Sequence, residues 1–312
     1  MYQLVLNQLI VMALIALAGF VFAKIVKVSE KEQKFLSKLL LYFVNVCLII
    51  DSFNLEYDEG KFRRFLFAGL VALIIHLAMI FVSFLLTHSK NAENRSYNHI
   101  DRLAMVLTNC GFIGIPLIKG TLGNAGVFYL MGYLTVFNIL AWTWGLYQMS
   151  GTISLKKIIV NPVILSAIFG VFLFLMPFTL PEPLIRPIKM IGDCNTALAM
   201  VMVGILFADF HFSSKYTLRL IKAVLGRLIL CPLIALLIIF AIWKMNPNVS
   251  DARTILFVVL ICASCPAATT VPGLAALFDK DAAYASLTVS VSSLLCIFSV
   301  PAFVALAENL LT

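Results

Sequence analysis

The residues best suited to chemistry in this sequence lie where two apolar runs are interrupted. The first interruption reads NCGFIGIPLIKGTLG from Asn109, with Gly111 and Gly114 just ahead of Pro116. Proline removes a backbone donor and clashes with the preceding turn, and glycine leaves the helical region at low cost. We therefore expect a helix to break here in mid-membrane, with its second half starting near Leu117.

The second interruption reads CASCPAATTVPG from Cys262. Pro266 and Pro272 bracket small and hydroxylated residues, so this helix should break too, with its second half starting near Ala267. The number of residues between Pro116 and Pro266 is similar to the number between each apolar run of the first half and the matching run of the second half. Paired interrupted helices in matching positions of two halves are a typical sign of a transporter site.

Broken helices of this kind offer a site for an anion. An anion in mid-membrane must recover lost hydration, and the free N–H groups and partial positive charge of a helix N-terminus supply it. Two such ends at one crossing would hold a carboxylate without a buried Lys or Arg, which suits apolar runs with hardly any central basic residue. Lys119 either contributes to this site or marks the membrane edge. The positions expected to line the site are Asn109, Gly111, Gly114, Ile115, Pro116, Cys265, Pro266, Ala267, Thr269 and Thr270.

Each polar side chain at the breaks has two interpretations. Asn109 offers two donors and an acceptor, and it either binds substrate or caps the carbonyl groups exposed at the break; the two roles are compatible. Thr269 and Thr270 either bond the substrate or satisfy their own backbone.

Coupling to a proton gradient requires a titratable group in or near the membrane. The candidates in the sequence are Asp51, Asp193 and His76. An imidazole ordinarily titrates near neutral pH, although a histidine that faces a neighbouring helix is a common structural feature. Asp193 lies near the start of its run and is either an intramembrane functional carboxylate or a solvated helix cap. Sodium would instead use backbone carbonyl groups of the broken helices.

The elements that must position these residues are apolar runs of membrane-spanning length. The chain has 312 residues, of which 62% are hydrophobic and 12% charged, with a mean hydropathy of +1.02. A soluble domain of this size cannot bury so many apolar side chains. The runs lie at 4–23, 35–53, 65–87, 103–119, 125–148, 160–179, 187–209, 217–243, 254–272 and 283–306. They predict an all-α integral membrane protein of about ten transmembrane helices.

The pairing of the runs predicts two five-helix repeats, residues 1–150 and 151–312. An odd number of helices per repeat makes the second copy insert upside down, so the repeats are inverted and the broken helices 4 and 9 cross. Most of the 23 Lys and Arg residues lie in the loops that follow helices 1, 3, 5, 7 and 9. Cytoplasmic enrichment in basic residues then places both termini outside.

Several other classes of protein are disfavoured by the sequence. Cys262 and Cys265 form a lone C-x-x-C pair without a second pair or supporting histidines, which predicts neither a metal nor a redox centre. The motifs H-E-x-x-H and G-x-S-x-G are absent, so we expect no enzyme and no cofactor. The net charge of +8 forms no single basic face, which disfavours nucleic acid as a partner.

At these motifs the sequence resembles the auxin efflux carrier family, in particular its bacterial branch of malate and malonate permeases, relatives of the plant PIN auxin carriers. The resemblance covers essentially the whole chain. It implies inverted five-helix repeats that cross at Pro116 and Pro266, and alternating-access transport of a small organic anion across the cytoplasmic membrane by a homodimer. The anion would be malate, malonate or an auxin-like acid. The residues that carry the resemblance are TNCGFIGIPL at 108–117, ASCPAATTVPGLAALFDKDAAYAS at 263–286 and VNPVILSAIFG at 160–170, with weaker matches at 36–42 and 191–209.

The resemblance also bears on three of the other helices. It implies a substrate contact for Asn138, although a hydrogen bond between helices is the alternative, and Asn45 has the same two interpretations. The family pattern places prolines in helices 2 and 7 where this chain has Val46 and Ala197. The bend of those two helices is therefore open.

Two further functions stay open beside the organic-anion carrier. One is a Na+- or H+-coupled symporter for another amphipathic acid, similar to a bile-acid symporter. The other is a channel or receptor without coupled transport, which internal inverted duplication disfavours because channel filters usually arise from rings of subunits. Substrate identity, direction, coupling ion and oligomeric state do not follow from the sequence.

Overall fold

The computed structural model describes residues 2–87, 92–152, 162–176, 178–208, 216–245 and 248–311. Within these ranges the chain forms helices, and the only β-type pairing is one isolated bridge. Seven of the described helices are long and apolar enough to cross a membrane, and two shorter apolar helices accompany them. The all-α membrane fold is confirmed, whereas a total of about ten spanning helices stays a prediction.

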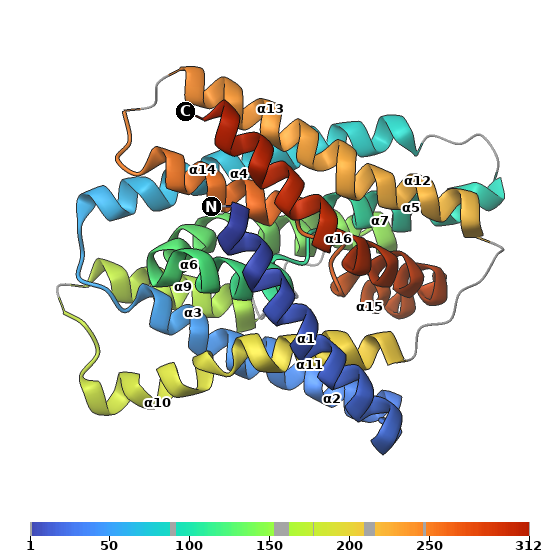
Figure 1. Ribbon diagram of the computed structural model, residues 1–312, viewed down its shortest axis with the longest axis horizontal. Helices are drawn as coiled ribbons and strands as arrows, with labels where there is room; N and C mark the ends of the chain where they lie inside the picture. Colours follow the sequence, from blue (N-terminus) through green and yellow to red (C-terminus); the bar gives the residue numbers. More distant parts are fainter. Residues whose placement is uncertain are drawn as a thin grey trace.

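The first half of the chain runs from α1 to α7 (Figure 1). Its elements are α1 (Tyr2–Val26), α2 (Glu30–Leu39), the π-helical turn η1 (Leu40–Val44), α3 (Asn45–Phe53), α4 (Glu59–Leu86), α5 (Ala92–Val106), the π-helical turn η2 (Cys110–Gly114), α6 (Ile115–Leu140), the π-helical turn η3 (Ala141–Gly145) and α7 (Leu146–Ser150). Gly123 interrupts α6 with a φ of 63°, in a region that side chains with a Cβ rarely adopt. Gly123 thus separates the part of α6 that belongs to the predicted helix 4 (residues 103–119) from the part that belongs to the predicted helix 5 (residues 125–148).

The second half of the chain runs from α9 to α16 (Figure 1). Its elements are α9 (Pro162–Leu175), α10 (Glu182–Asp193), α11 (Asn195–Ala208), α12 (Thr217–Leu225), the π-helical turn η5 (Gly226–Leu230), α13 (Cys231–Lys244), α14 (Ala252–Ser264), α15 (Thr270–Leu277) and α16 (Ala282–Leu310). Asp281 caps α16 by accepting the N–H of Tyr284 at 2.9 Å, which satisfies one of the free donors at this helix start.

The predicted helix 4, which starts with α5 in the structure, begins earlier than its apolar run 103–119 indicates. The polar residues 88–102 separate the apolar runs 65–87 and 103–119, which predicts a connection between two helices, yet α5 already begins at Ala92; residues 88–91 lie outside the described ranges. The expectation is wrong because hydropathy alone cannot detect a helix whose polar side chains are paired inside the protein. Asp101, for example, is buried and forms an ion pair with Arg219 of α12.

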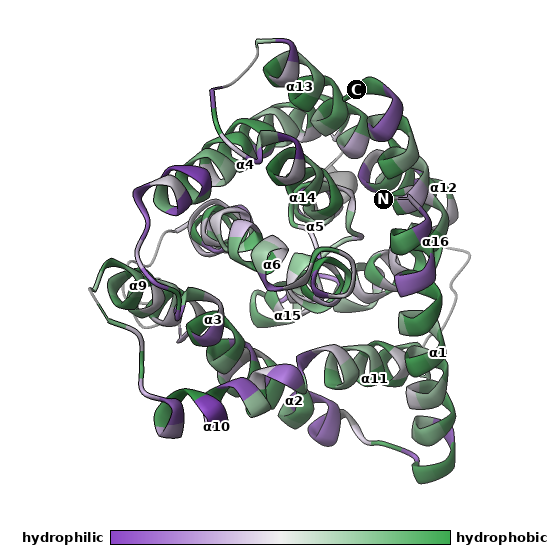
Figure 2. Ribbon diagram, turned by 60° about the vertical axis from the view of Figure 1, so that its left-hand side comes forward, coloured by the Kyte–Doolittle hydropathy of each residue, from purple (hydrophilic) through white to green (hydrophobic). Residues whose placement is uncertain are grey.

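The helices form two groups. The first group contains α1, α2, α3, α9, α10 and α11, and the second contains α4 to α7 and α12 to α16; Figures 1 and 2 both show α10, α2, α11 and α1 on one side of the molecule and α13 and α4 on the other. In the first group α1 and α11 pack at backbone distance, because a Cβ on Gly19 would lie 2.5 Å from the carbonyl oxygen of Val201. Glycine is required at such an approach.

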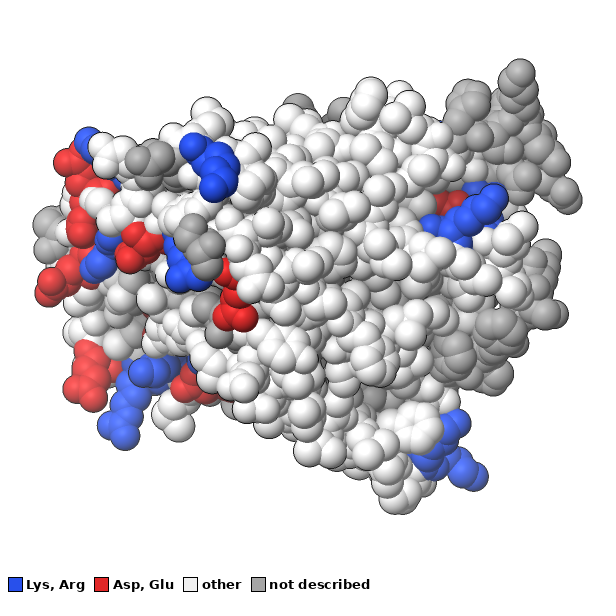
Figure 3. Space-filling view, turned by 45° about the horizontal axis from the view of Figure 1, so that its top comes forward, with Lys and Arg blue, Asp and Glu red and all other residues white. Residues whose placement is uncertain are grey.

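The surface matches a membrane environment. Figure 3 shows charged side chains near the two ends of one face, with a broad uncharged region between them. Large apolar side chains within the spanning helices, such as Phe81 and Phe298, are 66% and 75% exposed. Water would penalise such surface, whereas lipid does not.

Candidate substrate-binding site at the helix crossing

Two helices stop inside the molecule, and the chain segments that follow them pair with each other. The backbone N–H of Asn109 donates to the carbonyl oxygen of Pro266 at 2.8 Å, and the N–H of Ala268 donates to the carbonyl oxygen of Leu107 at 2.9 Å. The two segments run antiparallel, as expected for two halves inserted in opposite orientations. This pairing satisfies backbone groups that the ends of α5 and α14 would leave unbonded inside the protein.

The centre of the crossing lies between Thr108 and Ala267. These two residues form the isolated antiparallel bridge, and both are fully buried. The pair of hydrogen bonds around them is related by a local two-fold axis, so Leu107 is the counterpart of Pro266. Ser292 of α16 supports the crossing by accepting the N–H of Ala267 at 3.2 Å.

Pro116 does not lie at the crossing. The helix restarts at Cys110 with η2, and Pro116 lies further along it, where η2 continues into α6. The expectation that the second half begins near Leu117 is therefore wrong, whereas its counterpart begins at Thr270, close to the expected Ala267. Backbone pairing between the two repeats ends α5, and proline is not needed for it.

Asn109 has an unpaired donor at the start of this half-helix. The residue is 4% exposed, and its side-chain Nδ2 is buried without a hydrogen-bond partner. Its side chain makes no capping bond, so the capping interpretation is not supported. The first intrahelical bond is donated by Ile113 to the carbonyl oxygen of Asn109, and the N–H groups of residues 110–112 precede it. A buried unpaired donor costs about 1–3 kcal/mol, which an anionic ligand would offset.

The two glycines after Asn109 have different surroundings. A Cβ on Gly111 would meet no atom within 4 Å, so there is open space beside the break. A Cβ on Gly114 would lie 3.2 Å from Cβ of Cys110 and 3.4 Å from Sγ of Cys265. Gly114 therefore allows the two breaks to pack closely, while Gly111 faces a space that a ligand can occupy. The neighbouring Ile115 is fully buried in the core.

The second break also contains unpaired hydroxyl groups. The Oγ of Ser264 and the Oγ1 of Thr270 are buried without hydrogen-bond partners. Thr269 lies at the N-cap position of α15 but makes no side-chain cap bond. The interpretation that these threonines satisfy their own backbone is therefore not supported at Thr270.

Arg227 is a component of the crossing that the sequence analysis missed. It lies in η5, in the middle of the spanning helix formed by α12 and α13, and it is fully buried. Its Nη1 donates to the carbonyl oxygen of Met105 and its Nη2 to that of Ala263. The expectation of a crossing without a buried basic residue is wrong. The available signal was Arg227 in the interior of the apolar run 217–243, which a hydropathy average conceals.

The other two asparagines bond within the protein. Nδ2 of Asn195 donates to Oδ1 of Asn45, which joins α11 to α3 and matches the interhelical interpretation of Asn45. Nδ2 of Asn138 donates to the carbonyl oxygen of Leu134 at 2.8 Å, one turn earlier in α6. A substrate contact at Asn138 thus stays a prediction that this geometry does not favour.

Helices 2 and 7 are irregular although Val46 and Ala197 replace the family prolines. Helix 2 contains the π-helical turn η1 directly before Asn45, and helix 7 is interrupted at Cys194, between α10 and α11. The irregularities therefore do not depend on proline at these two positions.

Asp193 is the last residue of α10, so its expected place at a helix start is wrong. Its carboxylate accepts a hydrogen bond from Nζ of Lys119 at 2.5 Å, and its side chain is 49% exposed. This ion pair joins α10 of the first helix group to α6 of the second. Asp51, at the end of α3, is half-buried and lies within the electrostatic reach of Lys119 and Asp193.

His76 lies inside the second helix group. It is fully buried, and its Nδ1 lies 2.7 Å from the carbonyl oxygen of Ala72, so this nitrogen donates. Its ring contacts the ring of Tyr133 at 4.9 Å between centroids, and the hydroxyl of Tyr133 lies 3.4 Å from Oγ1 of Thr108. His76 is thus connected to the crossing through one side chain.

A second polar cluster missed by the sequence analysis joins α5, α12 and α16. The carboxylate of Asp101 accepts hydrogen bonds from Arg219 at 2.7 Å and from the hydroxyl of Tyr284 at 2.6 Å. Next to it, the hydroxyl of Tyr216 donates to Asp281 at 2.6 Å. That hydrogen bond raises the pKa of the Tyr216 phenol above its ordinary value, so the phenol keeps its proton at neutral pH.

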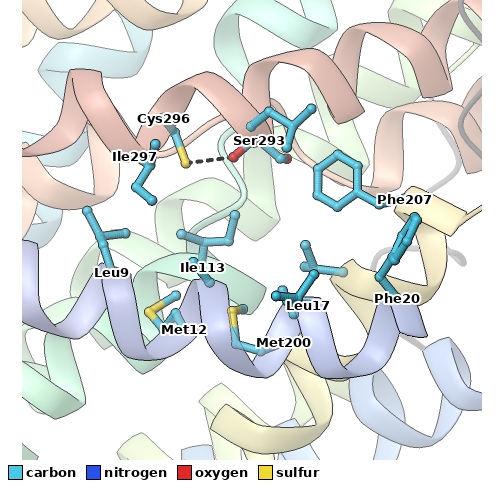
Figure 4. Close-up of a pocket in the computed structure, with 14 residues that line it drawn as sticks. Leu9, Met12, Leu17, Phe20, Ile113, Met200, Phe207, Ser293, Cys296 and Ile297 are labelled. Atoms are coloured by element: carbon cyan, nitrogen blue, oxygen red, sulfur yellow. Dashed lines mark hydrogen bonds between the residues drawn. The ribbon is translucent and has the colours of Figure 1, made fainter. Parts of the chain in front are cut away.

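An apolar cavity of about 450 Å³ lies between the two helix groups. Figure 4 shows side chains of α1, α11 and α16 around it, together with Ile113 of η2. Ile113 follows Asn109 by one helical turn, and Ser293 of α16 follows Ser292, which contacts the crossing. The cavity therefore adjoins the crossing on its side toward α1. Among the described residues, no group of His, Cys, Asp and Glu side chains could hold a metal ion.

Comparison with known proteins agrees with this architecture. A family model described as membrane transport protein matches the chain twice, over residues 4–154 and 148–304. The two matches correspond to the two halves that cross at Thr108 and Ala267. The chain belongs to the auxin efflux carrier family. This auxin efflux carrier family member is thus a multi-pass membrane transporter with two repeats. None of the curated proteins compared with the chain matches it.

Proposed function

We propose that this transporter carries small organic anions and that the carboxylate binds at the crossing of the broken helices. The observation that carries this proposal is the buried, unpaired amide of Asn109 beside the first N–H groups of a half-helix. A carboxylate is an acceptor with about four lone-pair sites, and it complements this unpaired Nδ2 donor. The partial positive charge of the half-helix acts in the same direction.

The adjoining cavity favours an acid with an apolar body. Its lining includes Met12 of α1, Met200 of α11 and Ile297 of α16, and few polar atoms line it. Malate and malonate would leave this space without suitable contacts, whereas an auxin-like or other amphipathic acid would fill it. We therefore rank amphipathic monocarboxylates above dicarboxylates as substrates.

The two helix groups support alternating access as the proposed mechanism. The cavity has one wall in α1 and α11 and the opposite wall in α16 and η2. Relative movement of the two groups would expose the cavity to one side of the membrane and then to the other. The ion pair of Lys119 with Asp193 connects the groups in the present conformation.

The remaining assignments rest on charge and resemblance. We place the protein in the cytoplasmic membrane of a bacterium, with both termini outside, because basic residues gather after helices 1, 3, 5, 7 and 9. A homodimer is proposed from the family resemblance. The substrate is the only small-molecule partner proposed, with H+ or Na+ as the coupling ion still open.

Uptake into proteoliposomes tests the function. Purified protein would be given labelled indole-3-acetate, malate and malonate, with imposed pH, sodium and voltage gradients. Saturable uptake of indole-3-acetate, faster than that of either dicarboxylate, is expected. Accumulation driven by a gradient would identify a coupled carrier, whereas equilibration alone would favour a channel or a uniporter. Absence of uptake of all three acids by folded, inserted protein would contradict the proposal.

A further inference from the structure

Arg227 is a buried cation that joins two helix ends from different repeats. Its guanidinium donates to the carbonyl oxygens of Met105 and Ala263, which lie in the last turns of α5 and α14. The preceding Gly226 packs against the side chain of Met105, where a Cβ would lie 2.7 Å from Cε. The π-helical turn η5 begins at Gly226, and such turns often occur at functional sites.

The crossing contains two negative and two positive helix ends. The C-terminal ends of α5 and α14 carry partial negative charge, and the N-terminal ends of η2 and α15 carry partial positive charge. Arg227 bonds to carbonyl groups of both negative ends. The negative ends are thus compensated by the protein itself, and the positive ends are left for a ligand.

Arg227 has no carboxylate partner in the described ranges. Ion pairs there include those of Arg63, Lys119 and Arg219, and Arg227 takes part in none. Its Nε is also buried without a hydrogen-bond partner. A charged side chain inside a membrane protein is costly, and such residues usually pair or mark a substrate or ion path. Dipoles at two helix ends compensate only part of a full charge.

We propose that Arg227 is the fixed cation of the transport site, which supplies the positive charge that selects anions and fills the place of a carbonyl-bound sodium ion. The first part of this inference, the selection of anions, rests on the proposed function, and the second part, the replacement of a sodium ion, does not. Backbone carbonyls at broken helices are the usual ligands for Na+ in transporters of this type. Here Arg227 holds the carbonyl groups of Met105 and Ala263, one from each end, so Na+ does not have this pair as free ligands.

The second part of the proposal is tested on the unaltered protein. The temperature of unfolding in detergent would be measured in NaCl, KCl and N-methylglucamine chloride at equal ionic strength. We expect values that agree within about 1 °C, because an ion that binds only the folded state would raise the temperature with its concentration. A sodium-specific rise that saturates would overturn the proposal. This measurement requires no substrate.

The first part is tested with Arg227→Met and Arg227→Lys, using indole-3-acetate and its uncharged analogue indole-3-acetamide as probes. We expect Arg227→Met to weaken indole-3-acetate binding by about tenfold or more and to leave indole-3-acetamide binding unchanged, because only the anion interacts with the charge. Arg227→Lys keeps the positive charge that the anion interacts with, and its affinity for the acid should stay within about threefold of the unaltered protein.

Each outcome of the variants decides the role of the charge. Equal weakening of the acid and the amide in folded Arg227→Met would assign Arg227 a structural role alone and overturn the proposal, and so would unchanged affinity for the acid. If Arg227→Met does not fold, Arg227→Lys decides, and a tenfold loss of acid affinity in that folded variant would overturn the proposal. If the unaltered protein binds neither probe, the proposed function fails for this acid, and the sodium measurement alone decides about Arg227.

Discussion

The backbone N–H of Asn109 donates to the carbonyl oxygen of Pro266 at 2.8 Å, so each repeat holds the broken helix of the other. The main chain forms this link, and it therefore does not depend on the side chain of Asn109. The side-chain Nδ2 of Asn109 is buried without a partner in the described part of the chain. Structure and binding are thus separable at this position, which allows the site to be tested without disturbing the crossing.

Asn109→Ala should weaken binding of the transported acid by about tenfold, because it removes a donor that bonds nothing else. The temperature of unfolding should change little, since the backbone link to Pro266 is kept. Affinity and thermal unfolding in detergent would be measured side by side. Asn7→Ala, on the exposed face of α1, is the matched control and should alter neither quantity. Unchanged affinity in folded Asn109→Ala would remove Asn109 from the site.

Valine at Gly111 should lower the affinity for substrate, whereas valine at Gly114 should lower the stability of the protein. Gly111→Val places its methyl groups in open space, so the protein should fold and lose affinity as the space beside the break is filled. Gly114→Val would overlap with Cys110 and Cys265 and should destabilise the protein by about 1–3 kcal/mol. Thermal unfolding separates the two variants, and binding is then measured on the folded one. Full affinity in Gly111→Val would show that the substrate lies elsewhere.

The ion pair of Lys119 with Asp193 should affect the rate of transport more than stability. Half-exposed pairs contribute about 0–1 kcal/mol, so Lys119→Ala and Asp193→Ala should unfold at nearly the unaltered temperature. Each variant should change the maximal uptake rate, because the pair joins the two helix groups in one conformation. The charge-exchanged protein, with Lys119→Asp and Asp193→Lys, should recover the original rate. Additive effects in this cycle would mean that the two residues act independently.

Asp101→Asn should cost about 2–3 kcal/mol of stability, since it removes one charge of a largely buried ion pair. The figure lies below the value for fully buried pairs because the side chain of Arg219 is 21% exposed. Tyr284→Phe, which removes only one neutral donor to Asp101, should cost about 1 kcal/mol. Thermal unfolding of both variants checks the order of the two effects. Equal losses would assign the stability of this cluster to packing rather than to charge.

Local features of the sequence were sufficient for the membrane fold and the approximate place of the breaks. Apolar runs identify spanning helices because lipid requires them, and Asn109, Gly111 and Pro266 mark the interruptions through backbone chemistry that neighbours in sequence determine. The family resemblance, confirmed by the two family matches, rests on the same segments. These local features did not predict the register of the crossing. In the structure Thr108 pairs with Ala267, and Pro116 takes no part.

Long-range pairing explains the other misses. Arg227 and Asp101 are acceptable in the interior because their partners lie on helices more than one hundred residues away or on separate elements, and no window of sequence contains both partners. Asp193 was expected near a helix start because its apolar run begins shortly before it. The helix in fact extends back to Glu182 and ends at Asp193, where Lys119 compensates the carboxylate.

The glycine contacts between α1 and α11 have a consequence for how this protein is made and how it arose. Gly19 meets the backbone of Val201, and Gly204 meets the backbone of Ala16, so a helix of the first repeat has its closest partner in the second. During synthesis α1 enters the bilayer before α11 has been made, so the glycine face of α1 contacts lipid until α11 is inserted. The same interlocking means that an ancestral single repeat would have needed a second, oppositely inserted copy to cover that face. The duplication thus joined, in one chain, two units that were incomplete when apart.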